Sequence, residues 1–198
     1  PDESLSVTFK GQRMEAVAGP DGEWRVTLAP MKADADPAVL TVRGGDGAVE
    51  IRDVRVGEVW ICSGQSNMAM ALKDVRDAMT HIAAADYPTM RLLSMPVEAA
   101  ALPRDRTTGK RKPVWRACAP TTAGDFSAVA FFFARDLLKR LDVPIGLIVV
   151  ATGATPIEQW VPRAGLDVTP ELADWAAEAR MLDETYGREL AAWEAGGK

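Results

Sequence analysis

Histidine and cysteine are scarce in this chain of 198 residues, which has one histidine, His81, and two cysteines, Cys62 and Cys118. Two cysteines cannot make a multi-bridge disulfide framework, so the fold must be held by apolar packing. Cys62 lies in a predicted core strand, which favours a buried free thiol, and the state of Cys118 stays open. No group of His, Cys, Asp and Glu has metal-ligand spacing, and there is no glycine-rich phosphate loop. The sequence therefore predicts neither a metal nor a cofactor.

Long apolar runs and an excess of basic residues are also absent. No run approaches the ~20 apolar residues that cross a bilayer, so no membrane span is predicted. The net charge of −5 argues against a nucleic-acid binder. The one basic cluster, in residues 104–116, is expected to be a solvated loop, with contact to an anionic ligand as the alternative. The chain opens without Met, which indicates a processed or trimmed start and leaves secretion open. We expect a secreted, periplasmic or lysosome-like compartment.

The first 56 residues have the pattern of an all-β segment. Alternating apolar residues predict strands at 4–10, 24–28, 39–43 and 49–56, separated by Gly/Asp-rich turns. Strands at this spacing suggest half of a β-sandwich or jelly roll. Because the segment is short for a complete sandwich, we expect it to pack on the next domain or on a preceding segment that is absent here.

From residue 57 onward, predicted strands alternate with predicted helices. Strands are expected at 59–62, 90–95 and 145–150, and helices at 67–85 and 126–141. The continuous apolar run at 145–150 is typical of a central parallel strand covered on both faces. This order predicts an α/β doubly wound half-domain. We therefore divide the chain into a β-rich segment (1–56), an α/β part (57–165) and a helical insertion or tail (166–198).

The strand at 59–62 leads into a corner that could carry chemistry. It ends at Ser63-Gly64, and a helix is expected to start at Asn67 or Met68. A strand, a glycine turn and a helix together lift one side chain out at the carboxyl edge of a parallel sheet. Ser66 would be exposed there, beside backbone N–H donors for an oxyanion. On spacing alone, a capped helix start is the alternative.

The wider string around this corner is specific. Residues 57–68 read Gly-Glu-Val-Trp-Ile-Cys-Ser-Gly-Gln-Ser-Asn-Met. This string resembles the first block of the sialate O-acetylesterase family, a branch of the SGNH (GDSL-like) hydrolases. Residues 126–133, 143–148 and 155–160 are similar to the same family in order and spacing. The resemblance covers roughly residues 20–165 and implies an α/β, flavodoxin-like hydrolase fold with three α/β/α layers and a parallel sheet, of which this chain holds the N-terminal part.

The resemblance also implies a reaction. The serine of Gly-Gln-Ser-Asn, here Ser66, is the family's nucleophile, so we expect a serine carboxylesterase that removes O-acetyl groups from a carbohydrate through an acyl-enzyme. Sialate is the family's name substrate, and acetylated xylan or another glycan is the alternative. The Ser66 N–H and Gly153 would supply the oxyanion donors. Ala154 replaces the second glycine of the family's Gly-Gly-Thr corner, which is harmless unless that position requires a positive φ angle.

Four further residues are assigned to the substrate side of the site. Gln65 and Asn67 flank the nucleophile and are expected mainly to hold the turn in shape by hydrogen bonds. Glu158 and Trp160 follow the second glycine corner and could line the sugar pocket. A buried acceptor and a core aromatic are the equally weighted alternative for these two.

A general base for Ser66 is missing from the sequence, although a serine normally needs a histidine held by a carboxylate. On a straight helix His81 would lie about 22 Å along the axis from Ser66, so we expect an ordinary surface or interface histidine. The family's Gln-Gly-Glu and Asp-x-x-His blocks do not occur in these 198 residues. We therefore expect the rest of the hydrolase on a continuation or a second polypeptide, and an inactive chain on its own.

Two rival functions stay open. One is a non-catalytic carbohydrate-binding or scaffold protein that retains the hydrolase half-fold. The other is a lipase-like α/β-hydrolase, but its usual Gly-x-Ser-x-Gly corner is altered here, where Asn67-Met68 follows the serine.

Overall fold

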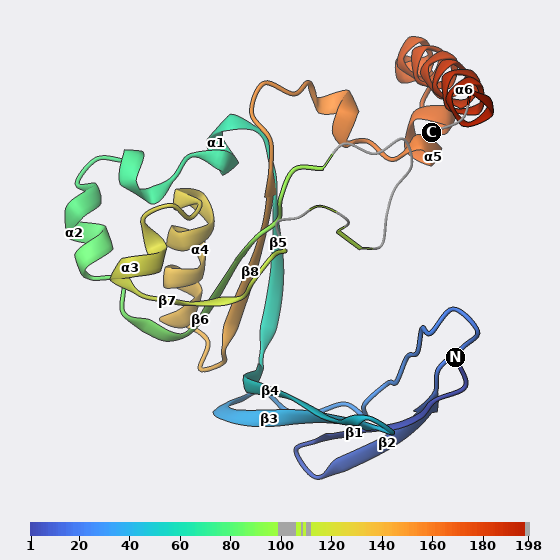
Figure 1. Ribbon diagram of the computed structural model, residues 1–198. Helices are drawn as coiled ribbons and strands as arrows, with labels where there is room; N and C mark the ends of the chain where they lie inside the picture. Colours follow the sequence, from blue (N-terminus) through green and yellow to red (C-terminus); the bar gives the residue numbers. More distant parts are fainter. Residues whose placement is uncertain (99–105, 108, 110–111, 197–198) are drawn as a thin grey trace.

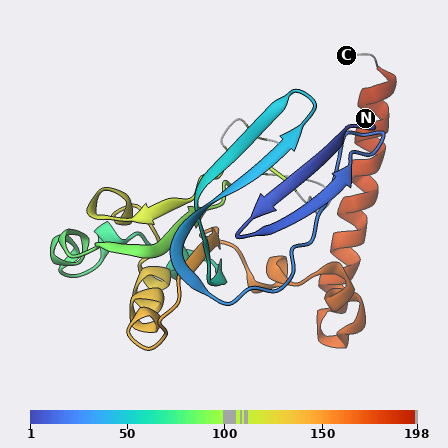
Figure 2. The same ribbon diagram turned by 90° about the horizontal axis from the view of Figure 1, so that it is seen from below.

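The computed structural model describes residues 1–98, 106–107, 109 and 112–196 as two four-stranded sheets with helices beside the second (Figure 1). The first sheet has the strand order β2-β1-β3-β4, and the second has the order β5-β8-β6-β7. They are joined at Gly57, where a Cβ would lie 2.1 Å from the Pro144 carbonyl oxygen. No side chain fits at this junction. Helices α1 to α4 lie on one side of the second sheet and α6 on the other (Figures 1 and 2).

The first sheet is antiparallel throughout. It consists of β1 (Ser4–Phe9), β2 (Gln12–Val17), β3 (Asp34–Gly44) and β4 (Gly47–Val56). The strands predicted at 4–10, 39–43 and 49–56 are confirmed, and β3 begins earlier than expected. Among the described residues no second sheet packs against this one, so the β-sandwich or jelly-roll assignment stays a prediction.

The strand predicted at 24–28 is wrong, because β1 forms a hairpin with the segment that follows it directly. Lys10 and Gly11 connect β1 to β2 with φ angles of 44° and 79°, the left-handed pair that a tight two-residue hairpin turn requires. Residues 23–33 form no strand. The Gln12 side chain instead bonds both backbone groups of Ala29, at 2.7 and 3.2 Å. This segment is thus held next to β2 by one side-chain amide, where a strand would be held by a series of backbone hydrogen bonds.

The second sheet contains three parallel strands and one antiparallel strand. These are β5 (Glu58–Gly64), β8 (Ile145–Ala151) and β6 (Tyr87–Ser94), followed by the antiparallel β7 (Arg116–Cys118). The prediction that 145–150 forms a central strand is confirmed. A flavodoxin-like order would place the first parallel strand between the next two. Here β8, the last parallel strand along the chain, holds that central place.

The core lies between this sheet and α4 (Ala128–Leu138), the helix predicted at 126–141. Ser127 caps its first turn by accepting a 3.2 Å hydrogen bond from the Ala130 N–H. Phe131 is fully buried in this core, whereas Phe133 is exposed, so the helix packs against the sheet along one side.

The opposite face of the sheet is open among the described residues. Val59 and Ile61 of β5 are 61% and 71% exposed, and Val150 of β8 is exposed as well. On the central strand β8, Gly146 is buried and Ile148 is half-buried on this face, so the prediction that the strand is covered on both faces is met only in part by the described residues. Its described helices supply one covering layer, and the three-layer arrangement stays a prediction.

The continuous helix predicted at 67–85 is also wrong. The segment forms three short helices, α1 (Ser66–Ala69), η1 (Leu72–Asp74) and α2 (Ala78–Ala83). Leu72 and Lys73 donate their backbone N–H groups to the carbonyls of Phe126 and Gly124, at 2.8 and 2.9 Å. Because these partners lie in the loop before α4, tertiary hydrogen bonds replace helical ones, and Leu72 is pulled fully into the core.

The last part of the chain is helical, as expected. After β8 it contains η2 (Ile157–Trp160), α5 (Arg163–Val168), η3 (Pro170–Leu172) and α6 (Ala173–Ala195). The remaining helix, α3 (Pro120–Ala123), lies between β7 and α4. Ion pairs join α5 to α6, Arg163 to Asp183 at 2.8 Å and Arg180 to Asp167 at 2.6 Å. None of the helices in the described part of the chain is both long enough and apolar enough to cross a membrane.

Candidate functional site

Two glycine-containing corners meet at the carboxyl edge of the second sheet. Strands β5 and β8 end side by side, with Gly64 opposite Ala151, and the Thr152 N–H donates to the Gly64 carbonyl at 3.1 Å. A Cβ placed on Gly153 would lie 3.6 Å from the Ser66 Oγ. The register of two parallel strands therefore brings the Ser66 hydroxyl next to the backbone of Gly153, far away in the sequence.

Ser66 is the first residue of α1, a single turn of four residues. The N–H groups of a first helical turn have no intrahelical partner and are available to an anion. Ser66 and both its neighbours, Gln65 and Asn67, are exposed. Within the described part of the chain, the hydrogen bond of the Ser66 Oγ is to the Gln65 Oε1, at a long 3.4 Å. The hydroxyl is thus accessible and is not held by a basic group.

A hydrogen-bonded network holds the two corners together. The Gln65 Nε2 donates to the Thr155 carbonyl at 2.6 Å. The Thr155 hydroxyl donates to the Thr152 carbonyl and accepts from the Trp160 Nε1, both at 2.9 Å. Thr155 is therefore the central residue of the network. In the sequence, Thr155 is only part of the stretch 155–160 that is similar to the family. No local pattern indicates its role, because only the folded register shows that Gln65 reaches it.

Of the other residues assigned to the substrate side, one is bonded within this network and two are not. Trp160 is half-buried, and its indole N–H is already used by Thr155. Glu158 is half-buried on η2 and makes no hydrogen bond to the Ser66 Oγ. Asn67 is exposed, with no side-chain hydrogen bond to another described residue. The structure thus leaves Asn67 and Glu158 free of the bonds that fix Gln65 and Trp160.

Ala154 adopts the left-handed conformation, with φ of +59°. A side chain with a Cβ is disfavoured in this region by roughly 1–2 kcal/mol, whereas glycine enters it freely. The requirement for a positive φ at this corner is therefore present, and alanine satisfies it with local strain. The backbone N–H of Ala154 is retained.

His81 lies on α2 and packs edge-on against Phe132 of α4, with the ring centroids 5.0 Å apart and the rings at 84°. Since the helix after Ser66 is broken, the straight-helix distance to His81 does not apply. The ring contact nevertheless holds the His81 side chain against α4. In the described part of the chain no imidazole is hydrogen-bonded to the Ser66 Oγ.

Neither cysteine is suited to act as a nucleophile in this structure. Cys62 and Cys118 are both free and buried. Burial raises the pKa of both thiols, that of Cys118 to about 11 with a further contribution from the charge of Asp86. Both are therefore neutral near pH 7. No group of three His, Cys, Asp or Glu side chains in the described part of the chain could hold a metal ion.

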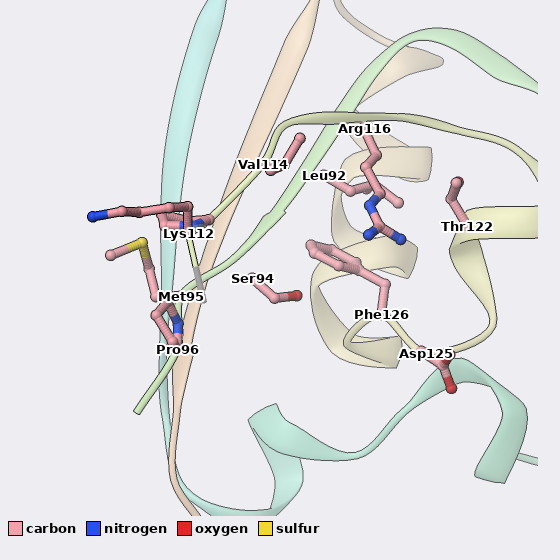
Figure 3. A pocket seen from close by; sticks show the side chains of 11 residues that line it. Leu92, Ser94, Met95, Pro96, Lys112, Val114, Arg116, Thr122, Asp125 and Phe126 are labelled. Atoms are coloured by element: carbon pink, nitrogen blue, oxygen red, sulfur yellow. The ribbon is translucent and has the colours of Figure 1, made fainter. Parts of the chain in front are cut away.

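A cavity of about 280 Å³ opens at the same carboxyl edge, beyond the end of β6 (Figure 3). Its described lining includes Leu92, Ser94, Arg116, Asp125 and Phe126. Ser94 pairs with Val149 on β8, and the neighbouring Val150 pairs with Ser63 on β5. Two strand spacings, roughly 10 Å across the sheet, therefore separate the cavity from the end of β5, which Ser66 follows.

Comparison with known proteins places this geometry in a family. The model of the carbohydrate esterase family described as sialic acid-specific acetylesterase matches residues 56–184, which include both corners. The sialate O-acetylesterases of Rattus norvegicus and Homo sapiens are each 32% identical to this chain, over 78% and 81% of its length. These alignments cover 30% and 33% of the two relatives, so the chain spans about a third of their length.

A solved structure shares the fold as well. The crystal structure of a carbohydrate acetylesterase from Xanthomonas citri matches with a TM-score of 0.80 and 36% sequence identity. The match covers 85% of this chain and 38% of the other. Since the family model covers more than half of the sequence, the chain belongs to the carbohydrate esterase family of sialic acid-specific acetylesterases.

Proposed function

We propose that this chain is the nucleophile-bearing part of a serine carboxylesterase that removes O-acetyl groups from a carbohydrate. The observation that carries the proposal is the exposed Ser66 hydroxyl beside the backbone of Gly153, at the edge where β5 and β8 end together. Family membership supports the reaction class, since the curated relatives are named as sialate O-acetylesterases.

In the proposed reaction the Ser66 Oγ attacks the carbonyl carbon of the acetyl group while its proton passes to a base. The carbonyl oxygen becomes an oxyanion and accepts hydrogen bonds from the N–H groups of Ser66 and Gly153. The ester C–O bond then breaks, and the sugar oxygen takes the proton and leaves as a hydroxyl. Water hydrolyses the resulting acetyl-enzyme to acetate and regenerates Ser66.

The remaining assignments follow from the same proposal. Gln65 supports the nucleophile corner, because its bond to Thr155 joins the two turns. Asn67, Glu158 and Trp160 are assigned to the substrate side. The base is proposed to come from residues beyond this sequence, on a continuation or a second polypeptide that also completes the layers of the sheet. Segments 1–56, 57–165 and 166–198 are proposed as the structural units of a secreted, periplasmic or lysosome-like protein.

A fluorophosphonate probe tests the nucleophile, since only an activated serine reacts with it. The variant Ser66→Ala in the complete esterase is expected to lose labelling and several orders of magnitude in acetate release, as removal of a catalytic serine does elsewhere. Ser63→Ala is the matched control, because Ser63 is an exposed serine on β5, the strand that leads into the Ser66 corner. Retained acetate release in a folded Ser66→Ala variant would refute the assignment.

The rival function is non-catalytic carbohydrate binding on a retained half-fold. It is favoured by one observation, the amide of Gln65 as the partner of the Ser66 hydroxyl where an active triad has an imidazole. It predicts that the complete protein binds an acetylated glycan but is not labelled by the probe. Labelling of Ser66 together with acetate release would exclude it.

A further inference from the structure

The cavity beyond β6 has a polar interior that the proposed ester chemistry does not use. Figure 3 shows the Arg116 guanidinium and the Ser94 hydroxyl pointing into it, with the Phe126 ring between them in this view. Ser94 is the last residue of β6, and Arg116 is the first residue of β7. Two neighbouring strands therefore supply a cation and a hydroxyl to one small space.

The charge of Arg116 is not neutralised inside the described part of the chain, where this side chain forms no ion pair or hydrogen bond. The one carboxylate among the described lining residues, Asp125, points away from the cavity in Figure 3. It pairs instead with Lys73 at 2.6 Å, and that bond lowers the pKa of Asp125. The other lining cation, Lys112, directs its ammonium group outward. Among the described lining residues, Arg116 is thus the one cation that faces the cavity.

An unpaired guanidinium at a cavity wall favours a planar anion. Its fork of N–H donors matches the two oxygens of a carboxylate, and such charge-assisted pairs are stronger than neutral hydrogen bonds. The Ser94 hydroxyl can donate a further hydrogen bond to the same ligand. A volume of about 280 Å³ lies near the lower end of small-molecule sites, which suits one sugar unit rather than a long oligosaccharide.

The position of the cavity fits a substrate that also reaches Ser66. Both lie at the carboxyl edge of the sheet, two strand spacings apart, roughly 10 Å. An acetyl group at Ser66 and a second substituent in the cavity can therefore belong to one glycan. A cation at this place would act on the choice of substrate without taking part in the ester chemistry.

We propose that Arg116 binds a carboxylate carried by the glycan and thereby makes the enzyme prefer acetylated sugar acids over neutral acetylated sugars. This inference rests on the proposed function and names a residue that determines its specificity. Ser94 contributes a hydrogen bond to the same carboxylate, and Phe126 forms the adjoining wall.

Binding measurements on the folded protein test the inference directly. The probes are N-acetylneuraminate and glucuronate, each compared with its uncharged methyl ester by calorimetric titration. The unsubstituted protein is expected to bind each acid about 10- to 100-fold more tightly than its ester, as one charge-assisted pair allows. Arg116→Gln should remove this preference, and Arg116→Lys should keep part of it. Arg76→Gln, which removes an exposed arginine from another loop, should leave it unchanged.

Equal affinity for acid and ester, or a preference that survives Arg116→Gln, would overturn the inference. Thermal unfolding of each variant checks that the fold is intact. Fluorophosphonate labelling of Ser66 separates this inference from the proposed function. A complete protein that labels but shows no preference refutes the Arg116 site alone. One that prefers the acid but never labels refutes the esterase assignment alone.

Discussion

The methyl group added by Gly153→Ala is predicted to raise the free energy of unfolding and to lower the reactivity of Ser66. Its carbon would lie 3.6 Å from the Ser66 Oγ, an ordinary van der Waals contact, and the φ angle of Gly153 is not in the left-handed range. An L-residue is therefore tolerated in the folded state, while the unfolded chain loses conformational freedom. The free energy of unfolding should rise by about 0.4–1 kcal/mol, which raises Tm by about 1–4 °C in a chain of this size.

The reactivity of Ser66 should move in the opposite direction. An attacking oxygen needs the substrate carbonyl carbon within ~3–3.5 Å, and the oxyanion needs its donors within ~2.7–3.1 Å. A methyl group 3.6 Å from the Ser66 Oγ competes for that space and holds the carbonyl oxygen away from the N–H of residue 153. Loss of one oxyanion donor slows acyl transfer by about 10²–10³, or ~2.7–4 kcal/mol.

The assay compares rate constants of fluorophosphonate labelling and thermal unfolding for the same proteins, in the complete esterase. Gly187→Ala is the matched control, because Gly187 lies within α6 and has no atom within 4 Å of its Cβ position. It should raise the free energy of unfolding by about 1 kcal/mol without affecting labelling. Full-rate labelling of Gly153→Ala would refute the placement of Gly153 beside the oxyanion. Unfolding of that variant would refute the packing argument.

Two further predictions concern backbone strain and buried thiols. Ala154→Gly removes a left-handed alanine, a relief of about 1–2 kcal/mol offset by ~0.5–1 kcal/mol of glycine entropy, so denaturant unfolding should show a net gain of about 0.5 kcal/mol. Ala177→Gly, within α6, should instead lose about 1 kcal/mol, and equal effects of the two changes would contradict the strain. The pKa of Cys118 is raised from 9.0 to about 11, so the stability it contributes is complete below pH 9 and is lost as the pH rises toward 11. At pH 8 the folded protein should resist iodoacetamide at Cys118, as read by mass spectrometry, and alkylation at the rate of a free thiol would contradict its burial.

The elements that sequence patterns predicted correctly are those whose signal is local. The apolar run at 145–150 forms β8, and its central place follows from its lack of polar residues. The helix α4 was likewise predicted from its own apolar stretch, although the cap at Ser127 that sets its first residue was not. Such features need no knowledge of distant residues.

The predictions that failed depended on partners far along the chain or on an unusual turn. The helix expected at 67–85 breaks because Leu72 bonds the carbonyl of Phe126, which no local pattern reveals. The strand expected at 24–28 has the right alternation, but β1 is already paired through a turn in which Lys10 adopts a positive φ angle. Lysine is not a residue that signals such a turn, so the hairpin to β2 was missed.

The candidate site combines both kinds of information. Ser66 and its flanking residues follow from a local string, whereas its neighbour Gly153 and the central residue Thr155 depend on the register of β5 against β8. That register is fixed by seven consecutive pairs, from Glu58 opposite Ile145 to Gly64 opposite Ala151. A slip by one residue would move every side chain of β5 to the other face of the sheet, and with it the corner that holds the serine. The apolar pairing of β5 with β8 and the geometry of the ester site are therefore under the same constraint, so substitutions deep in these strands should affect labelling of Ser66 as well as stability.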